Sequence, residues 1–91
     1  MAHTTRDKGK LLLRVRRIRG QVEGLEKALA AEEDCSKILH QIAGCRGAMD
    51  GLMAEVLEGH IRLHVADPGA KPAERARATE NLIELIRSYL G

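Results

Sequence analysis

The chain has 91 residues, 15 of them Lys or Arg and 13 Asp or Glu, and Tyr89 is its single aromatic residue. This length allows one small domain over residues 1–91 with an aliphatic core, so association with further copies is expected to add to its burial. No apolar run approaches membrane-spanning length and the N-terminus lacks an apolar signal segment, which excludes membrane and secreted classes and predicts a cytoplasmic protein.

Charge is unevenly distributed along the chain. Residues 1–31 carry eight Lys and Arg against three acids, whereas residues 32–67 carry three against seven. A basic first third on a nearly neutral protein is compatible with phosphate binding. The two cysteines, ten residues apart on one predicted helix, cannot meet in a disulfide, which suits a reducing compartment.

The first residues, MAHTT, show no periodicity. Removal of the initiator Met before the small Ala2 would leave a free amine next to His3. This amine and the His3 imidazole can chelate a metal ion together. A solvated tail residue is the alternative interpretation of His3.

A first helix is predicted over about residues 5–31. Its apolar residues repeat with the 4,3,4,3,4 spacing of a helix that packs lengthwise against another: Leu11, Val15, Ile18, Val22, Leu25 and Leu29. The acids at residues 32–34 fit the start of a following helix better than the end of this one. The first helix should therefore end near Ala31.

Basic side chains follow one edge of this apolar seam, with no acid among them. The edge consists of Lys10, Arg14, Arg17 and Gln21, and Arg16 and Arg19 lie further round the helix. The three basic side chains of this edge, Lys10, Arg14 and Arg17, are the candidates for phosphate contact, and a solvated helix face is the alternative. Single-stranded nucleic acid is disfavoured because aromatic side chains that stack on bases are missing from the helix, and no helix-turn-helix spacing occurs.

One long helix is predicted over residues 34–65, where apolar residues recur at helical spacing without a proline or glycine pair. At about 100° per residue, six residues fall on nearly one line along it: Cys35, Ile42, Met49, Met53, His60 and His64. His60 and His64, four residues apart, can close on one metal ion. No Glu stands between them in the HExxH arrangement, so a metalloprotease is not indicated.

Cys35 cannot join the two histidines within one chain, because the helix from Cys35 to His60 spans roughly 37 Å. In an antiparallel pair of these helices, two-fold symmetry would set Cys35 of each chain beside His60 and His64 of its partner. The predicted metal site therefore exists only in an oligomer. Cys45 lies about 60° off the line and is expected to pack in the core.

The segment DPGAKP at residues 67–72 is the clearest loop, and it places Pro72 in the first turn of a third helix. That helix is predicted over residues 73–90 with a buried face of Ala78, Leu82, Leu85, Ile86 and Tyr89. It carries no cluster of chemically active residues, so its expected role is packing. The predicted fold class is all-α with three helices.

The chain resembles the CsoR/RcnR family of metal- and formaldehyde-responsive transcriptional repressors. The resemblance covers essentially the whole chain and is carried by RVRRIRGQVEGLEKAL, by Cys35, by QIAGCRGAMDGLMAEVLEGHI and by LIRSYLG. It implies a three-helix protomer that dimerises through antiparallel second helices and pairs again into a flat tetramer. It also implies that the basic residues of the first helix face DNA.

Within this family the ligand pattern His3, Cys35, His60 and His64 resembles the nickel/cobalt-responsive branch. Copper(I) sensors have a second cysteine at the place of His64, and persulfide sensors use two cysteines, the second of which Cys45 does not match. Formaldehyde sensors carry Pro where this chain has Ala2 and Glu where it has His64. The first helix nevertheless reads at least as much like the formaldehyde branch, in which an aldehyde carbon would bridge the N-terminal amine and Cys35.

The resemblance thus implies a repressor, not an enzyme, that holds double-stranded operator DNA through Lys10, Arg14 and Arg17, with Arg16 and Arg19 supporting. Binding of Ni(II) or Co(II) by the four ligands and the N-terminal amine would release the DNA. Six N, O and S donors suit these ions, whereas Zn(II) is content with four and is expected as an in vitro ligand. A metal storage protein and an enzyme with a Cys–His nucleophile are the alternatives from other classes.

Overall fold

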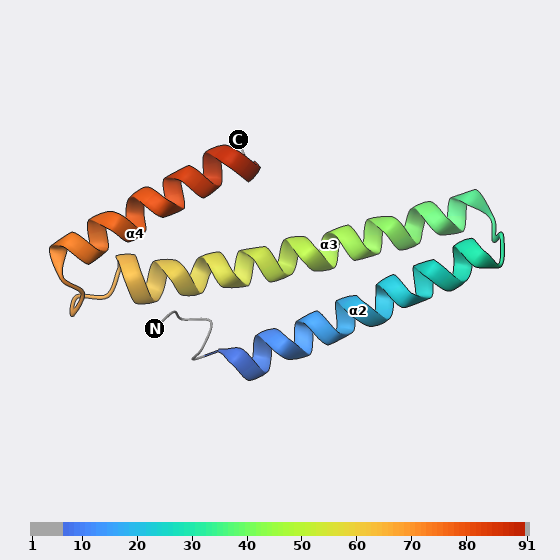
Figure 1. Cartoon of the computed structure of the whole chain (residues 1–91), viewed down its shortest axis with the longest axis horizontal. Coiled ribbons are helices and arrows are strands. Elements are labelled where there is room, and N and C mark those ends of the chain that lie inside the picture. Colours follow the sequence, from blue (N-terminus) through green and yellow to red (C-terminus); the bar gives the residue numbers. More distant parts are fainter. Residues whose placement is uncertain (1–6, 91) are drawn as a thin grey trace. The chain divides into compact units, whose positions relative to one another are not determined.

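The computed structural model describes residues 7–90, and no strand occurs in this range. Its helices are α2 (Lys8–Ala30), α3 (Cys35–His60) and α4 (Pro72–Leu85), and π-helical turns follow α3 at Ile61–Val65 (η1) and α4 at Ile86–Leu90 (η2) (Figure 1). The predicted all-α class with three helices is confirmed. Residues 7–54 form one compact unit, and residues 55–90 belong to a second.

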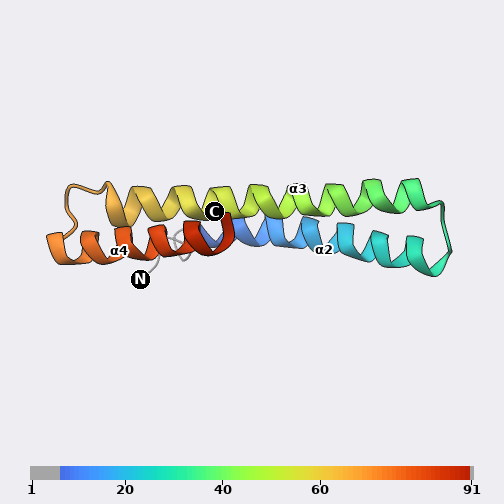
Figure 2. The ribbon, with the colours of Figure 1, turned by 90° about the horizontal axis from the view of Figure 1, so that it is seen from above.

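In the unit of residues 7–54, α2 and the first part of α3 lie side by side and antiparallel in both ribbon views (Figure 2). The predicted apolar seam of α2 is only partly covered. Leu11 is buried, but Val15, Val22 and Leu29 are 45 to 54% exposed. This exposure leaves much of the seam available to another protein surface.

Backbone geometry ends α2 within one residue of the predicted position. Glu32 has a φ of 55°, in the left-handed region. Its N–H donates to Leu29 O at 3.1 Å, and the N–H of Glu33 donates to Ala28 O at 3.0 Å. These two bonds form a Schellman motif, in which the left-handed position is usually glycine. The end of α2 is therefore set by a strained Glu32 rather than by the charge of the acids that follow.

The predicted second helix is present as α3 followed directly by η1. The N–H of Ala66 donates to Ile61 O, five residues back, at 2.7 Å. Bonds of this reach widen the helix into a π turn. Such turns occur mostly singly and are frequent at functional sites. The end of this helix, which carries His60 and His64, is thus wound differently from the rest.

A tight loop connects η1 to α4. The side chain of Asp67 accepts from the N–H of Gly69 at 2.9 Å, and the N–H of Ala70 donates to Asp67 O at 3.1 Å. Nη2 of Arg75 donates to the same Asp67 O at 2.8 Å and so ties α4 back to the loop. Pro72 stands in the first turn of α4, where its fixed φ favours the helix, as predicted.

The predicted buried face of α4 is covered only in part. Ala78 is 7% exposed, but Leu85, Ile86 and Tyr89 are 44, 43 and 72% exposed. Within residues 7–90 of a single chain these three side chains are exposed, so the prediction that they are buried is wrong for this range. In the part of the chain that the structure describes, no helix is long and apolar enough to cross a membrane.

Candidate functional site

Two of the predicted metal ligands, His60 and His64, lie next to each other. His60 is the last residue of α3 and His64 lies in η1. Their ring centroids are 5.3 Å apart, with 52° between the ring planes, and both residues are half-buried. The structure therefore brings this pair together, as the four-residue spacing predicts.

The ring of His60 is fixed by the backbone of α4. Its Nε2 lies 3.0 Å from the carbonyl oxygen of Ala78, which is buried. A carbonyl only accepts hydrogen bonds, so Nε2 must carry the hydrogen, and in the neutral ring the lone pair is then on Nδ1. Metal-binding histidines commonly hold one nitrogen in this way while the other faces the ion. The bond thus holds the His60 ring through its Nε2 atom.

The π turn changes how His64 is presented. The apolar periodicity predicts a regular α-helix as far as His64, whereas the helix winds as η1 from Ile61. A residue in a π turn advances less around the axis than in an α-helix, so the angular position of His64 relative to His60 differs from the one expected for an α-helix. No feature of the segment IRLHV signals this turn.

The other predicted ligands are not joined to this pair. Cys35 is the first residue of α3, is exposed and lies in the unit of residues 7–54. His3 and the N-terminal amine lie outside the described residues. Within residues 7–90, no group of three His, Cys, Asp or Glu side chains is arranged to hold a metal ion. Cys45, predicted to pack in the core, is a half-buried free thiol.

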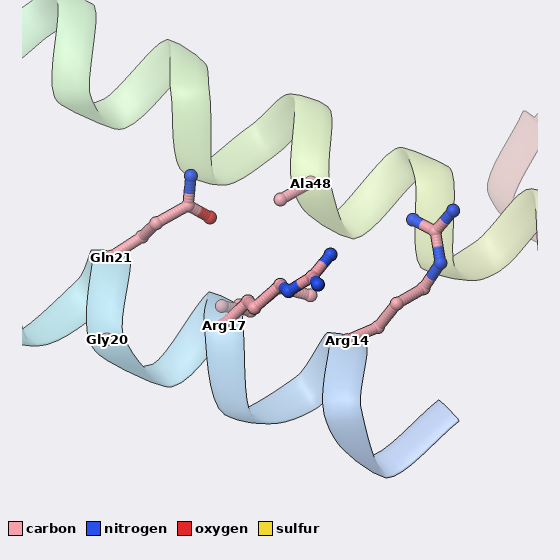
Figure 3. Close-up of a pocket in the computed structure, with 6 residues that line it drawn as sticks. Arg14, Arg17, Gly20, Gln21 and Ala48 are labelled. Carbon is pink, nitrogen blue, oxygen red and sulfur yellow. The ribbon is translucent and has the colours of Figure 1, made fainter. Parts of the chain in front are cut away.

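The basic edge of α2 borders a groove against α3. The groove has a volume of about 430 Å³ and is lined by Arg14, Arg17, Ile18, Gly20, Gln21 and Ala48 (Figure 3). Gln21 points from α2 toward α3, on the same side as Arg14 and Arg17. A Cβ at Gly51 would lie 3.1 Å from Nη1 of Arg14, so this guanidinium rests on the glycine surface of α3.

The remaining predicted DNA contacts also lie on α2. Lys10, Arg16 and Arg19 are exposed. Neither Arg16 nor Arg19 lines the groove, which agrees with their predicted place further round the helix. Periodicity alone identified the basic edge of α2. It did not predict that Ala48 of α3 lines the groove or that Gly51 of α3 lies against Arg14.

The chain is similar to known proteins over most of its length. Residues 7–88 match a family described as metal-sensitive transcriptional repressor. An uncharacterised protein of the bioA 5′ region of Serratia marcescens is 54% identical over 90 residues, which is 99% of each chain. The transcriptional repressor RcnR of Salmonella arizonae is 41% identical over 90 residues, again 99% of each.

A solved structure is also similar. It is a variant of the formaldehyde-responsive regulator FrmR from Salmonella enterica serovar Typhimurium, in which one glutamate is replaced by histidine. It is 48% identical in sequence, and the two folds superpose with a TM-score of 0.84 over 92% of this chain and 94% of the other.

Proposed function

The chain belongs to the family of metal-sensitive transcriptional repressors, and on this premise we propose that it holds operator DNA until Ni(II) or Co(II) binds and releases it. Members of this family are repressors rather than enzymes, and they act by binding DNA as oligomers. An operator-binding role also fits the predicted cytoplasmic location. The specificity for Ni(II) or Co(II) is inferred from the set of metal ligands.

The paired imidazoles of His60 and His64, with centroids 5.3 Å apart, are the observation that carries the proposal. Cys35 of a partner chain, His3 and the N-terminal amine would complete the donor set. One thiolate among several nitrogen donors suits Ni(II) or Co(II), and Zn(II) would be held by fewer of these ligands. When bound, the ion would supply a fixed bridge between donors of two chains.

The His60–Ala78 hydrogen bond offers a route from the metal site to the rest of the protein. A ligand on Nδ1 of His60 fixes the ring, and the ring in turn positions α4 through the Ala78 carbonyl. Metal binding therefore favours one placement of α4, and the protein changes its DNA affinity if that placement differs from the DNA-bound one. Because coupling is reciprocal, DNA should weaken metal binding by the same factor.

An antiparallel dimer through α3, paired again into a tetramer, is part of the proposal. Three apolar side chains on the predicted line of α3 are left exposed by the single chain: Ile42 at 45%, Met49 at 52% and Met53 at 41%. A second copy of α3 running in the opposite direction would cover them and bring Cys35 to the histidines of its partner.

DNA would be held by Lys10, Arg14 and Arg17, with Arg16 and Arg19 supporting. All five side chains are exposed on α2. Such contacts are mainly to phosphate, so affinity should fall steeply as salt concentration rises.

A formaldehyde-responsive repressor is the second candidate, because the similar solved structure is a variant of a formaldehyde-responsive regulator. In that case the N-terminal amine and the exposed thiol of Cys35 would condense with one formaldehyde molecule. The product is a methylene bridge between nitrogen and sulfur, and one water molecule leaves.

The test is the DNA affinity of the protein for a labelled duplex from upstream of its own gene, measured by fluorescence anisotropy without oxygen. We expect release by Ni(II) or Co(II), and loss of that response in His64→Ala and Cys35→Ala. Release by formaldehyde alone would favour the second candidate. Metal binding without any DNA affinity would instead indicate a storage protein.

A further inference from the structure

The groove between α2 and the first part of α3 has the chemistry of an anion site. We propose that it seats one backbone phosphate of the DNA, held by Arg14, Arg17 and the side-chain amide of Gln21 and admitted by the small side chain of Ala48. This inference rests on the proposed DNA-binding function. It goes further by giving Gln21 a contact with DNA and by making α3 a wall of the phosphate site.

Charge and hydrogen-bonding capacity both favour an anion. Two of the six lining residues carry guanidinium groups, and none is acidic. A guanidinium presents paired N–H donors that match phosphate oxygens, and the amide NH₂ of Gln21 adds further donors. All three side chains extend from one side of α2 toward α3 (Figure 3). Donors that converge from one helix face suit a single group better than an extended surface.

The walls of the groove reinforce this preference. Ile18, Gly20 and Ala48 contribute aliphatic or backbone surface, which has a low dielectric and concentrates the field of the two arginines. Arg14 already rests on α3 at Gly51. A donor placed before binding loses less conformational freedom when the anion arrives.

Filling the groove without changing charge is the first test. Ala48→Leu places a larger apolar side chain among the lining residues, and Ala54→Leu is the matched control, on an exposed position of the same helix. With the labelled duplex, we expect Ala48→Leu to lower DNA affinity about tenfold and to reduce the slope of log affinity against log salt by about one for each groove engaged. Ala54→Leu should leave both unchanged.

Changing the amide is the second test, and it leaves the packing between the helices alone because Gln21 is exposed. Gln21→Glu is nearly isosteric and sets a negative charge against the phosphate, so we expect a loss of at least about tenfold. Asn81→Asp, an exposed amide on α4, makes the same change in net charge and should have little effect. Circular dichroism and Ni(II) titration should show that all variants remain folded and bind metal.

The outcomes separate this inference from the proposed function. If Ala48→Leu and Gln21→Glu bind DNA as their controls do, the groove is not the phosphate site, although the repressor function stands. If only one of the pair loses affinity, the shared site is likewise refuted. If the unmodified protein shows no salt-dependent DNA affinity, both proposals fail.

Discussion

Replacing Glu32 by glycine is expected to stabilise the protein. The residue follows the end of α2 with a φ of 55°, and its carboxylate forms none of the ion pairs found in this turn. A left-handed conformation costs a non-glycine residue roughly 1–2 kcal/mol. Glycine avoids that cost but gives up about 0.5–1 kcal/mol through its greater freedom in the unfolded chain. The net gain is therefore about 0.5–1 kcal/mol per chain.

Glu33→Gly is the matched control, because it removes the same charge one residue away. Glu33 lacks a positive φ, and its carboxylate lies 2.7 Å from Nζ of Lys37. Glycine there brings the entropic cost without relief of strain and also removes a partly exposed ion pair worth about 0.3–0.5 kcal/mol. The two substitutions should thus change stability in opposite directions.

The measurement is thermal unfolding followed by circular dichroism at one fixed protein concentration, since oligomer stability depends on concentration. A gain of this size corresponds to a rise in Tm of roughly 2–8 °C for a chain of this length. Equal shifts in Glu32→Gly and Glu33→Gly, or a lower Tm for Glu32→Gly, would show that the left-handed residue does not strain this turn.

Three further outcomes are expected. Arg75→Ala removes the bond to Asp67 O and should cost about 1 kcal/mol, seen as a lower Tm, whereas Arg77→Ala on the exposed side of α4 should change Tm little. His64→Ala should weaken Co(II) binding in an absorption titration at least about 100-fold, because even outer partners of metal ligands contribute roughly 10–100-fold. Substitution of the exposed His40 by alanine should leave Co(II) affinity unchanged. Equal Co(II) affinities of the two variants would show that His64 is not a ligand. DNA affinity should fall about 10³-fold or more between 50 and 200 mM salt if six or more phosphates are contacted, and a flat salt profile would exclude that mode of binding.

Periodicity and loop chemistry were sufficient to predict the three helices. The heptad-like seam of α2, the uninterrupted apolar pattern of α3 and the segment ending at Pro72 each specify local structure, which depends on near neighbours in the sequence. The adjacency of His60 and His64 follows from the same local rule. These predictions needed no knowledge of tertiary contacts.

Features that depend on context were not predictable. The positive φ of Glu32 falls on a residue type that rarely adopts it, and nothing in the segment IRLHV marks the π turn. The burial expected for Leu85, Ile86 and Tyr89 presumes a surface that residues 7–90 of a single chain do not supply. The hydrogen bond from His60 to Ala78 joins residues 18 apart, and the accepting group is one that every amino acid possesses.

Since the acceptor for the His60 ring is a main-chain oxygen, no exchange of side chain at position 78 deletes the acceptor itself. Mutants that uncouple sensing from repression should accordingly map to residues that shift the whole helix, such as those in the turn before Pro72, rather than to the anchor point. A selection for repressors that no longer respond should therefore recover substitutions at residues that position α4, and none at Ala78 itself.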